Sequence, residues 1–491
     1  MLIDKQNHKS SLSRVSVFVA SAITVSFCAL LMISTGIHAA VFPDINIEQY
    51  QDLEWLSEVS KPATKADDCC AKPSFDMPKG IAKVEQQILF SRQDGSWMFQ
   101  SLVNNGLFEI AAGYQPQHPR ALLIKSGSLT LDQLYTRVAN KAILAKKEVG
   151  YQLFYPIIIE PSAALIIDNP LELTSEAGVA IINRGQLYIR NGSVSASVDI
   201  SNRFRSFILS WNGSYTSIID SQLKNLGYDD FLSKGLTLTA HEQSQASKPG
   251  VLMVESSVFE GAFVGVRSNA GNVLLTNNEF KHSRSEAIDL RNSSVQVLKN
   301  KVQGTKTGHG IRLISNRSQV VTKNSVSGSA KSGLVISDTP VLNEITGNKL
   351  QENGENGLWI DLIKPKNAET LIIKGNIAAN NQLSGIKTNC IELCLFQSNL
   401  LIGNKSYGFT LENPSVHTHH LILQKNYFKL NGLASVQASG FDELTLSDNK
   451  FYFDAIQSKV FVGDLEPYQS LIQKSLSEQN QGIRIKKEMI Q

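Results

Sequence analysis

Short apolar runs separated by polar turn residues dominate residues 265–431, and no segment between them has the length and spacing of an amphipathic helix. Within this stretch a small residue followed by an apolar residue returns at successive steps of 22, 23, 23, 24, 28 and 23 residues. The pairs are Gly265-Val266, Ala287-Ile288, Gly310-Ile311, Gly333-Leu334, Gly357-Leu358, Gly385-Ile386 and Gly408-Phe409. Such a period predicts a solenoid with one repeat in each coil, and the runs rich in Val, Ile, Leu and Thr predict strands.

Asparagines follow the same period, each leading into a short strand-like run: Asn278, Asn300, Asn324, Asn348, Asn376, Asn404, Asn426 and Asn449. Two patterns in register predict a parallel β-helix of coils of about 23 residues, with three strands per coil and about 4.8 Å between coils. We expect the asparagines to point inward and satisfy turn backbone, and the glycines to occupy corners that need positive φ. An ankyrin or leucine-rich array is disfavoured, because no helix-length segment separates the repeats.

Both ends of such a solenoid need covers, because an unpaired coil edge promotes aggregation. From residues 127–134 the chain has the character of a short helical segment, and the helical segment near residues 130–145 is the expected N-terminal cap. Apolar strands follow at 154–160 and 164–168. The charged, helix-favouring tail is the expected C-terminal cap. The prediction is an all-β chain with an extension or linker over 41–120, a β-helix over 121–465 and a capping tail over 466–491.

The first 40 residues have the organisation of a secretory signal peptide. Basic residues precede an apolar run over 15–33, and the small residues Ala39 and Ala40 follow it. Cleavage there would release the rest of the chain into the periplasm. A retained membrane anchor is the alternative, because the apolar run is nearly long enough to span a bilayer. No later segment of the sequence has that length and apolar character.

Composition adds little about function. The chain has 491 residues, a mass of 53.9 kDa, a formal net charge of +3 and a pI of about 8.4, so no general electrostatic argument points to nucleic acid. An oxidising compartment would permit a disulfide between Cys390 and Cys394, whereas no histidine clusters with the cysteines as a zinc site would require. Asp-rich calcium repeats are also missing from the sequence, so we expect neither metal nor cofactor.

Outward strand positions should form columns along the surface, because alternate residues of a strand face the same side. Two residues after each small residue of the repeat, the sequence reads Arg267, Asp289, Arg312, Val335, Trp359, Lys387 and Thr410. Four residues after it, the sequence reads Asn269, Arg291, Ile314, Ser337, Asp361, Asn389 and Glu412. These spacings predict one patch that contains Arg267, Asp289, Arg291 and Arg312.

This patch has the residue types that bind acidic sugars. Arginine binds carboxylates through two parallel hydrogen bonds, and Trp359 offers an aromatic face to a sugar ring. His309 should lie at the edge of the patch and Arg317 on the turn beyond it. An acidic polysaccharide is therefore the expected ligand, although outward charges can also be solvated without any binding role.

Local stretches that occur in order from about residue 127 to the C-terminus resemble one family. They are residues 207–211, 225–228, 261–265, 304–311 and 379–385, with the sequences FILSW, NLGY, GAFVG, GTKTGHGI and ANNQLSG. In these stretches the chain is similar to the periplasmic mannuronan C5-epimerases of alginate producers, the AlgG-like proteins. The resemblance implies a right-handed parallel β-helix and a periplasmic enzyme that converts β-D-mannuronate in a polymer into α-L-guluronate.

The resemblance also implies a chemistry and a set of site residues. The reaction requires neutralisation of the C6 carboxylate, removal of the C5 proton and return of a proton to the opposite face. The family signature Asp-Pro-His-Asp falls on Asp289-Leu290-Arg291-Asn292, so Arg291 replaces the histidine thought to be the base. The family's carboxylate-binding arginine falls at Ser315. His309 matches a family histidine one coil further on; it is either an alternative base or a turn histidine bound to backbone.

Two functions stay open from the sequence. The first is an epimerase-like enzyme with the candidate catalytic residues Asp289, Arg291, His309, Arg312 and Arg317 and the candidate binding residues Arg267, Asn292, Ser315, Trp359 and Lys387. The second is a non-catalytic relative that binds and protects an acidic exopolysaccharide during export, with export-complex proteins as partners. The family resemblance makes the first the main prediction, whereas Arg291 favours the second, because a guanidinium is protonated at physiological pH. A surface adhesin would need a longer solenoid and an outer-membrane anchor.

Overall fold

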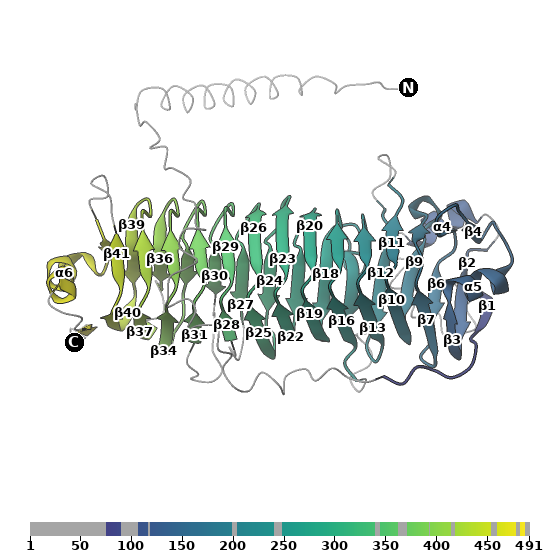
Figure 1. The fold of residues 1–491 in the computed structure, drawn as a ribbon, viewed down its shortest axis with the longest axis horizontal. Helices are drawn as coiled ribbons and strands as arrows, with labels where there is room; N and C mark the ends of the chain where they lie inside the picture. The colour runs from purple at the N-terminus through teal and green to yellow at the C-terminus, as the bar shows by residue number, and fades with distance from the viewer. Residues whose placement is uncertain are drawn as a thin grey trace, which may run out of the picture. The chain divides into compact units, whose positions relative to one another are not determined.

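In the computed structural model the chain winds into three long sheets that run side by side along one solenoid (Figure 1). The structure describes residues 75–89, 107–115, 118–198, 204–239, 248–338, 344–361, 371–391, 393–413, 418–452, 459–477 and 482–486. All of them belong to the compact unit Asp44–Gln491. The predicted signal peptide lies outside the described residues. Parallel pairing between successive coils confirms the predicted parallel β-helix.

The sheet that carries the candidate site, called sheet 1, has 15 strands. In order they are β1 (Lys83–Ile88), β2 (Arg120–Lys125), β6 (Ile157–Ile159), β9 (Ala180–Asn183), β12 (Phe207–Trp211), β15 (Gly235–Thr239), β18 (Val264–Asn269), β21 (Ile288–Arg291), β24 (Ile311–Ile314), β27 (Leu334–Ser337), β30 (Leu358–Asp361), β33 (Ile386–Thr388), β36 (Tyr407–Glu412), β39 (Ala434–Ser439) and β42 (Phe461–Gly463).

Sheet 2 has 14 strands: β3 (Gly127–Thr130), β7 (Ala163–Ile167), β10 (Gln186–Arg190), β13 (Tyr215–Ile219), β16 (Val251–Glu255), β19 (Asn272–Thr276), β22 (Ser294–Leu298), β25 (Ser318–Thr322), β28 (Glu344–Thr346), β31 (Leu371–Lys374), β34 (Leu393–Gln397), β37 (Thr418–Gln424), β40 (Phe441–Ser447) and β43 (Ile483–Lys486). Each coil passes from sheet 1 through sheet 2 to sheet 3 and back to sheet 1.

Sheet 3 also has 14 strands: β4 (Leu144–Lys146), β5 (Tyr151–Leu153), β8 (Leu171–Leu173), β11 (Ser193–Ala196), β14 (Gln222–Lys224), β17 (Val258–Glu260), β20 (Glu279–Ser283), β23 (Lys301–Thr305), β26 (Ser325–Ser329), β29 (Lys349–Gln351), β32 (Ile377–Ala379), β35 (Leu400–Ile402), β38 (Tyr427–Lys429) and β41 (Lys450–Tyr452). Inward side chains of the three sheets form one apolar core along the solenoid.

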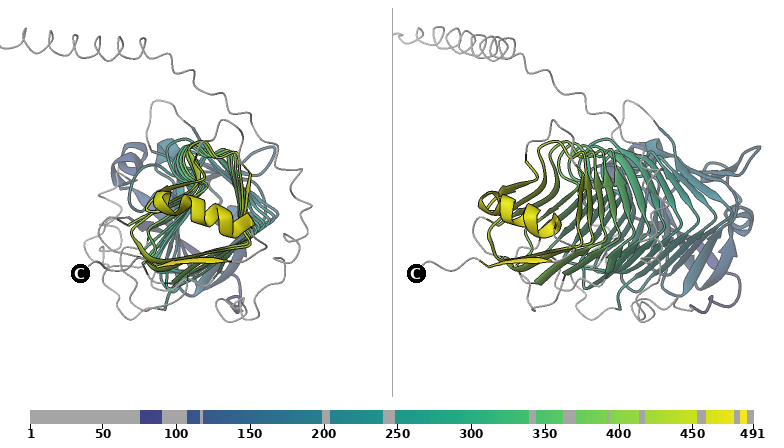
Figure 2. Two further views of the ribbon diagram at one scale, coloured as in Figure 1. Left: turned by 90° about the vertical axis from the view of Figure 1, so that its left-hand side faces the viewer. Right: turned by 60° about the vertical axis from the view of Figure 1, so that its left-hand side comes forward.

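A helix covers each end of the solenoid. At the N-terminal end α5 (Leu131–Val138) packs on β3, β4 and β7, and its first turn carries a capping box between Thr130 and Gln133. Residues 127–130 were expected in the helical segment but form β3, because they pair with β7 and Thr130 caps the helix. At the other end α6 (Gln469–Ser477), after the turn η4 (Glu466–Tyr468), lies across the last coil (Figure 2). None of the helices in the described part of the chain is long and apolar enough to cross a membrane.

Stacked asparagines satisfy the turn backbone, as the sequence predicted, but in two ladders. The first runs through Asn278, Asn300, Asn324, Asn348, Asn376, Asn399, Asn426 and Asn449, and each side-chain amide donates to the next side-chain oxygen at 2.9–3.2 Å. The second runs through Asn353, Asn381, Asn404 and Asn431. Asn404 was therefore placed in the wrong series, because Asn399 stands before β35 and Asn404 after it.

The repeat glycines are required for a reason other than the one predicted. None of Gly265, Gly310, Gly333, Gly357, Gly385 and Gly408 has a positive φ. A Cβ at Gly310 would lie 2.3 Å from a methyl of Val326 and 2.7 Å from the carbonyl oxygen of Gly333. The small residue is needed because chain segments approach closely at this corner, whereas positive φ occurs elsewhere, for example at Asn277 and Lys299.

Among the described residues, a helix covers the outer face of sheet 1 near its N-terminal end. Helix α4 (Leu107–Tyr114) buries Leu107 and Ala111 against outward side chains of β2, β6, β9 and β12, and Leu232 adds to this outer cluster. One outward column of sheet 1 accordingly begins with the buried apolar residues Leu123, Ile158, Ile182 and Leu209. Where the cover ends, the same column becomes polar and charged.

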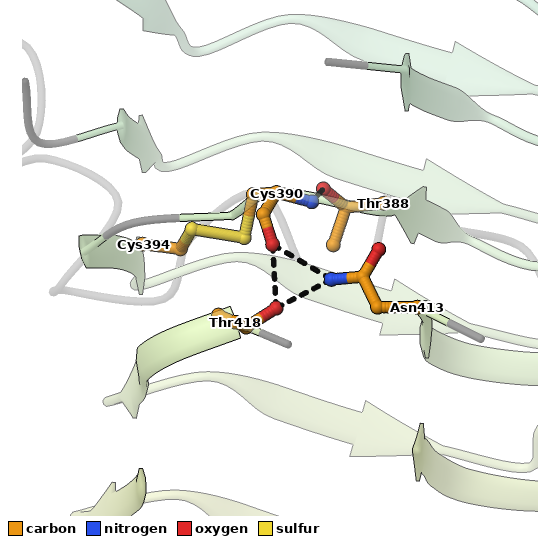
Figure 3. The surroundings of a disulfide bond; sticks show 5 residues. All are labelled: Thr388, Cys390, Cys394, Asn413 and Thr418. Atoms are coloured by element: carbon orange, nitrogen blue, oxygen red, sulfur yellow. Dashed lines mark hydrogen bonds between the residues drawn. A yellow bond between two sulfur atoms is a disulfide. The ribbon is translucent and has the colours of Figure 1, made fainter. Parts of the chain in front are cut away.

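The structure contains a disulfide between Cys390, which follows β33, and Cys394 of β34 (Figure 3). The carbonyl oxygen of Cys390 accepts hydrogen bonds from the side chains of Asn413 and Thr418, which belong to the next coil. The bridge therefore fixes a corner to which the following coil is tied. Cys69 and Cys70 lie outside the described residues.

Candidate functional site

The predicted column of outward side chains exists on sheet 1. Successive strand registers align Thr237, Arg267, Asp289, Arg312, Val335, Trp359, Lys387, Thr410 and Gln437. The neighbouring outward column aligns Asn269 with Arg291 and Arg291 with Ile314. From Arg267 to Lys387 the column crosses five coil spacings, which is about 24 Å. The residues of the predicted patch therefore lie on adjacent coils of one face.

Asp289 is the centre of this face, which we call the arginine wall and define as Arg267, Asp289, Arg291 and Arg312. Its carboxylate is only 2% exposed. Nε of Arg291 donates to Oδ1 of Asp289 at 3.0 Å, and a terminal nitrogen of Arg291 donates to Oδ2 at 3.0 Å. Arg267, on the preceding coil, lies 3.7 Å from Oδ2. Two guanidinium groups thus neutralise one buried carboxylate, as a buried charge requires.

Arg267 is itself buried, at 9% exposure. Burial lowers the pKa of Arg267, and the Asp289 carboxylate acts in the opposite direction. The guanidinium carbon also lies 5.7 Å from the ring centre of Phe231, an exposed residue in the connection after β14. This cation–π contact holds Arg267 at the N-terminal limit of the arginine wall.

Arg312 has a partner that the outward columns did not predict. One of its terminal nitrogens donates to Oε1 of Glu286 at 3.0 Å, and Ser285 donates to the other carboxylate oxygen at 2.6 Å. Burial of Glu286 would raise its pKa, but the hydrogen bonds from Ser285 and Arg312 outweigh this effect and the pKa is lowered. The arginine wall together with Glu286 therefore contains three guanidinium groups and two carboxylates, which leaves one positive charge.

His309 occupies one step of a hydrogen-bonded series that runs from coil to coil. Its Nδ1 accepts the backbone N–H of Ser332 at 3.2 Å. In the next coils the hydroxyl of Ser332 accepts the backbone N–H of Asn356, and the side-chain oxygen of Asn356 accepts that of Ser384. His309 thus accepts a backbone N–H from the next coil, as Ser332 and Asn356 do on the following coils. Because Nδ1 is an acceptor, the neutral ring carries its proton on Nε2.

The environment of His309 keeps it neutral near pH 7. Burial lowers its pKa, and the nearby carboxylates of Glu355 and Glu286 only partly offset this. Its ring centre lies 6.3 Å from that of Trp359. The ring is therefore next to the candidate site, but its basic nitrogen is bound to the backbone.

Three predicted residues lie on the turns that leave sheet 1. Asn292 and Ser315 follow β21 and β24 with φ of 49° and 52°, and the side-chain amide of Asn292 donates to Asn269 at 2.9 Å. Arg317 is exposed and stands directly before β25 of sheet 2. These residues form a rim beside the arginine wall, and Arg317 adds a solvent-accessible cation to it.

Trp359 and Lys387 lie further along the column, separated from Arg312 by Val335. They line an open hollow of about 400 Å³. Lys387 pairs with Glu412 at 2.9 Å, and Asp361 accepts a hydrogen bond from Asn389 at 2.6 Å. Because two carboxylates and one lysine line this hollow, it suits the ring and hydroxyl groups of a sugar better than its carboxylate.

Glu286, Ser332 and Glu355 were missed by the sequence analysis. A signal was available for the first two, because the residue immediately before each small repeat residue is polar in five consecutive coils: Glu286, His309, Ser332, Asn356 and Ser384. Glu355 accepts a hydrogen bond from the Ser332 hydroxyl at 3.1 Å. Among the residues that the structure describes, no group of three or more His, Cys, Asp or Glu side chains could hold a metal ion.

Comparison with known proteins gives consistent results. Residues 206–364 match a family described as the right handed beta helix region. The chain is 24% identical over 412 residues to the mannuronan C5-epimerase of Pseudomonas putida, an alignment that covers 77% of this chain and 78% of that protein. It is 26% identical over 314 residues to the mannuronan C5-epimerase AlgG of Azotobacter vinelandii, covering 55% of this chain and 58% of the relative.

Solved structures agree on the fold. A crystal structure of a mutant of the periplasmic alginate epimerase AlgG matches with a TM-score of 0.66 and 19% identity, covering 82% of this chain and all of that one. A second crystal structure of the same epimerase matches with a TM-score of 0.55. The resemblance found in the sequence is thus confirmed, and this chain is a right-handed parallel β-helix related to the AlgG-like mannuronan C5-epimerases.

Proposed function

We propose that this protein acts in the periplasm on a polyuronate of the alginate type, as an epimerase-like relative of the mannuronan C5-epimerases. The observation that carries the proposal is the arginine wall, a row of guanidinium groups around a single buried aspartate on the outer face of sheet 1. A polyuronate presents one carboxylate per sugar, which is the group that guanidinium binds with two hydrogen bonds. The named activity of the relatives supports the same substrate class.

In this proposal the wall binds the C6 carboxylate and lowers the cost of negative charge when the C5 proton leaves. Arg312 and Arg317 are the cations that do not pair with Asp289, and Arg317 is exposed, whereas Arg267 and Arg291 hold Asp289 in place. The neutral His309 supplies an Nε2–H that can donate to the developing charge. Trp359 packs against a sugar ring further along the polymer.

A second candidate function is binding without epimerisation, in which the protein holds and protects an acidic exopolysaccharide during export. A specific observation favours it: neither candidate base presents a free lone pair. Arg291 donates through Nε and a terminal nitrogen to Asp289, and Nδ1 of His309 is occupied by the Ser332 N–H. General base catalysis needs an acceptor within hydrogen-bond reach of the C5 proton.

One experiment separates the two candidates. The mature chain is incubated with polymannuronate in deuterated water, and deuterium at C5 and guluronate are followed by proton NMR, with binding measured in parallel by calorimetry. An epimerase gives both signals, and Arg312→Gln lowers kcat/KM at least about 100-fold. Lys349→Gln, which removes an outward charge on sheet 3, leaves the rate unchanged.

Binding without exchange would support the second candidate, and the variant Arg291→His then tests its cause. If this chain is inactive because arginine stands where the family has histidine, Arg291→His should produce C5 exchange that the wild-type chain does not show. A wild-type chain that neither binds polymannuronate nor exchanges its C5 protons would contradict both candidates.

A further inference from the structure

A second concentration of positive charge lies at a corner of the solenoid, away from the outer face of sheet 1. Here the ends of β14, β17 and β20 in sheet 3 lead toward sheet 1, and they border a hollow of about 460 Å³. The charged residues that line it are Arg205, Lys224, Glu260, Arg284 and Lys306, and His282 is also part of its wall. Four cations therefore face one carboxylate in this hollow.

Arg284 is a partly buried cation in this hollow with an unsatisfied hydrogen-bond donor. Its Nε is buried and has no hydrogen-bond partner, while a terminal nitrogen donates to the carbonyl oxygen of Gly227. The guanidinium carbon lies 5.5 Å from the ring centre of Phe263, which holds the group in place. Burial lowers the pKa of Arg284, and the positive charge of Arg205 lowers it further. A buried donor without a partner is costly.

The other charges do not neutralise Arg284. Glu260 pairs with Lys224 at 3.4 Å, and both side chains are about half exposed. In the described part of the chain neither Arg284 nor Lys306 forms an ion pair, and Lys306 is exposed at the mouth of the hollow. The corner therefore has the cavity and the excess positive charge of an anion-binding site.

We propose that this hollow is a second carboxylate-binding subsite, which takes a uronate unit of the same acidic polysaccharide that the arginine wall binds. In its choice of ligand this inference rests on the proposed function. Arg284 supplies a guanidinium without an ion pair in the wall of the hollow, and Lys306 supplies an exposed ammonium at its mouth. A carboxylate between them gains charge-assisted hydrogen bonds and replaces no existing ion pair of either residue.

The position of the hollow indicates how the polymer would lie. Arg284 follows β20 directly and stands five residues before Asp289 in the same coil. The hollow is therefore at the edge of sheet 1 where its strands begin, and the rim with Ser315 and Arg317 is at the edge where they end. A chain bound in the hollow would enter sheet 1 beside the arginine wall, from which the outward column leads on to Trp359.

Binding of short mannuronate oligomers tests this subsite. Calorimetry compares the wild-type chain with Arg284→Gln and Lys306→Gln, and Lys349→Gln is the matched control for the loss of one outward positive charge. We expect Arg284→Gln and Lys306→Gln each to weaken binding by about tenfold and the control to bind like the wild type. Because Lys306 is exposed, its variant tests the subsite even if Arg284→Gln fails to fold.

His282 gives a local signal that does not depend on catalysis. Its imidazole lines the hollow and is solvent-exposed, and its NMR signal can be assigned by comparison with His282→Asn. We expect this signal to move on addition of mannuronate oligomers and to stay in place with a neutral oligosaccharide of equal length. Inorganic sulfate that competes with the oligomer at this signal would also support an anion site.

The outcomes distinguish this inference from the proposed function. An oligomer that shifts the His282 signal supports the subsite even if no C5 exchange occurs. The subsite is overturned, and the proposed function is kept, by a combination of three results. The wild-type chain exchanges C5 protons, its His282 signal does not move, and the Arg284→Gln and Lys306→Gln variants bind oligomer normally. No binding of oligomer by the wild-type chain overturns both.

Discussion

At the scale of single residues, the partners of each side chain decide what chemistry it can perform. Asp289 carries a buried negative charge, but its two oxygens are used by Arg291 and Arg267. His309 is adjacent to the arginine wall, but its acceptor nitrogen is used by the backbone of the next coil. Residue identity alone therefore describes this site incompletely, because the polar atoms of Asp289 and His309 are already bound within the protein.

The role of His309 leads to a prediction about pH. Its folded-state pKa is lowered, mainly by burial, whereas the unfolded-state value is about 6.5. The unfolded chain therefore binds the proton more readily, and the contribution of His309 to stability is complete above about pH 6.5 and is lost as the pH falls toward the folded-state value. We expect urea midpoints measured from pH 7.5 down to pH 5 to fall less in His309→Asn than in the wild type.

Asparagine is chosen because its side-chain oxygen can accept the Ser332 N–H without titrating. The control is His118→Asn, at an exposed histidine, which should retain the wild-type pH profile. An unchanged pH slope in His309→Asn would contradict the assignment of Nδ1 as a backbone acceptor.

At the scale of elements, the asparagine ladders join one coil to the next. Asn348 accepts from both the backbone N–H and the side chain of Asn324, at 3.0 and 2.9 Å. It donates in turn to Asn376 and to the carbonyl oxygen of Val321. These contacts lie inside the solenoid, where water does not replace a lost partner.

Asn348→Ala should therefore be strongly destabilising. It leaves the backbone N–H of Asn324 and one N–H of its side-chain amide without acceptors, so we expect the free energy of unfolding to fall by about 2–4 kcal/mol. Urea denaturation followed by circular dichroism measures this change. The matched control is Asn272→Ala, at an outward position of β19, which should stay within about 0.5 kcal/mol of the wild type. Equal effects of the two substitutions would show that the ladder adds little.

At the scale of the whole molecule, stability depends on closed ends. An open parallel coil presents unpaired backbone groups and an exposed apolar core to other chains. The N-terminal end has α5 and the antiparallel strand β1, which pairs with β2. The C-terminal end has α6 and the antiparallel strand β43, which pairs with β40. Antiparallel pairing at both ends stops the continuation of the parallel sheets.

Two neighbouring residues of α6 test the role of the C-terminal cover. Ile472 is fully buried, whereas Leu471 is 55% exposed. Ile472→Asp places a charge in an apolar contact, and we expect it to displace α6, to lower stability by roughly 3 kcal/mol or more and to produce soluble aggregates in size-exclusion chromatography with light scattering. Leu471→Asp should behave like the wild type. A wild-type elution profile for Ile472→Asp would mean that α6 is not needed as a cover.

Much of the fold and part of the site could be predicted from the order of residues. A period near 23 with alternating apolar positions predicts stacked strands, and alternation then determines which side chains face outward. The alignment of Arg267, Asp289 and Arg312 followed correctly from this. The ladder assignment of Asn404 failed because two asparagines, Asn399 and Asn404, flank β35 and the coil length varies there.

The sequence by itself determined the parallel β-helix, the outward column and the family resemblance, because these depend on periodic patterns that are repeated in every coil. Only the tertiary structure decided which groups are free. The pairing of Arg312 with Glu286, the backbone contact of His309 and the unpartnered Nε of Arg284 depend on distances between coils. Such distances are set by packing across about 4.8 Å of strand separation, and no pattern along the chain records them.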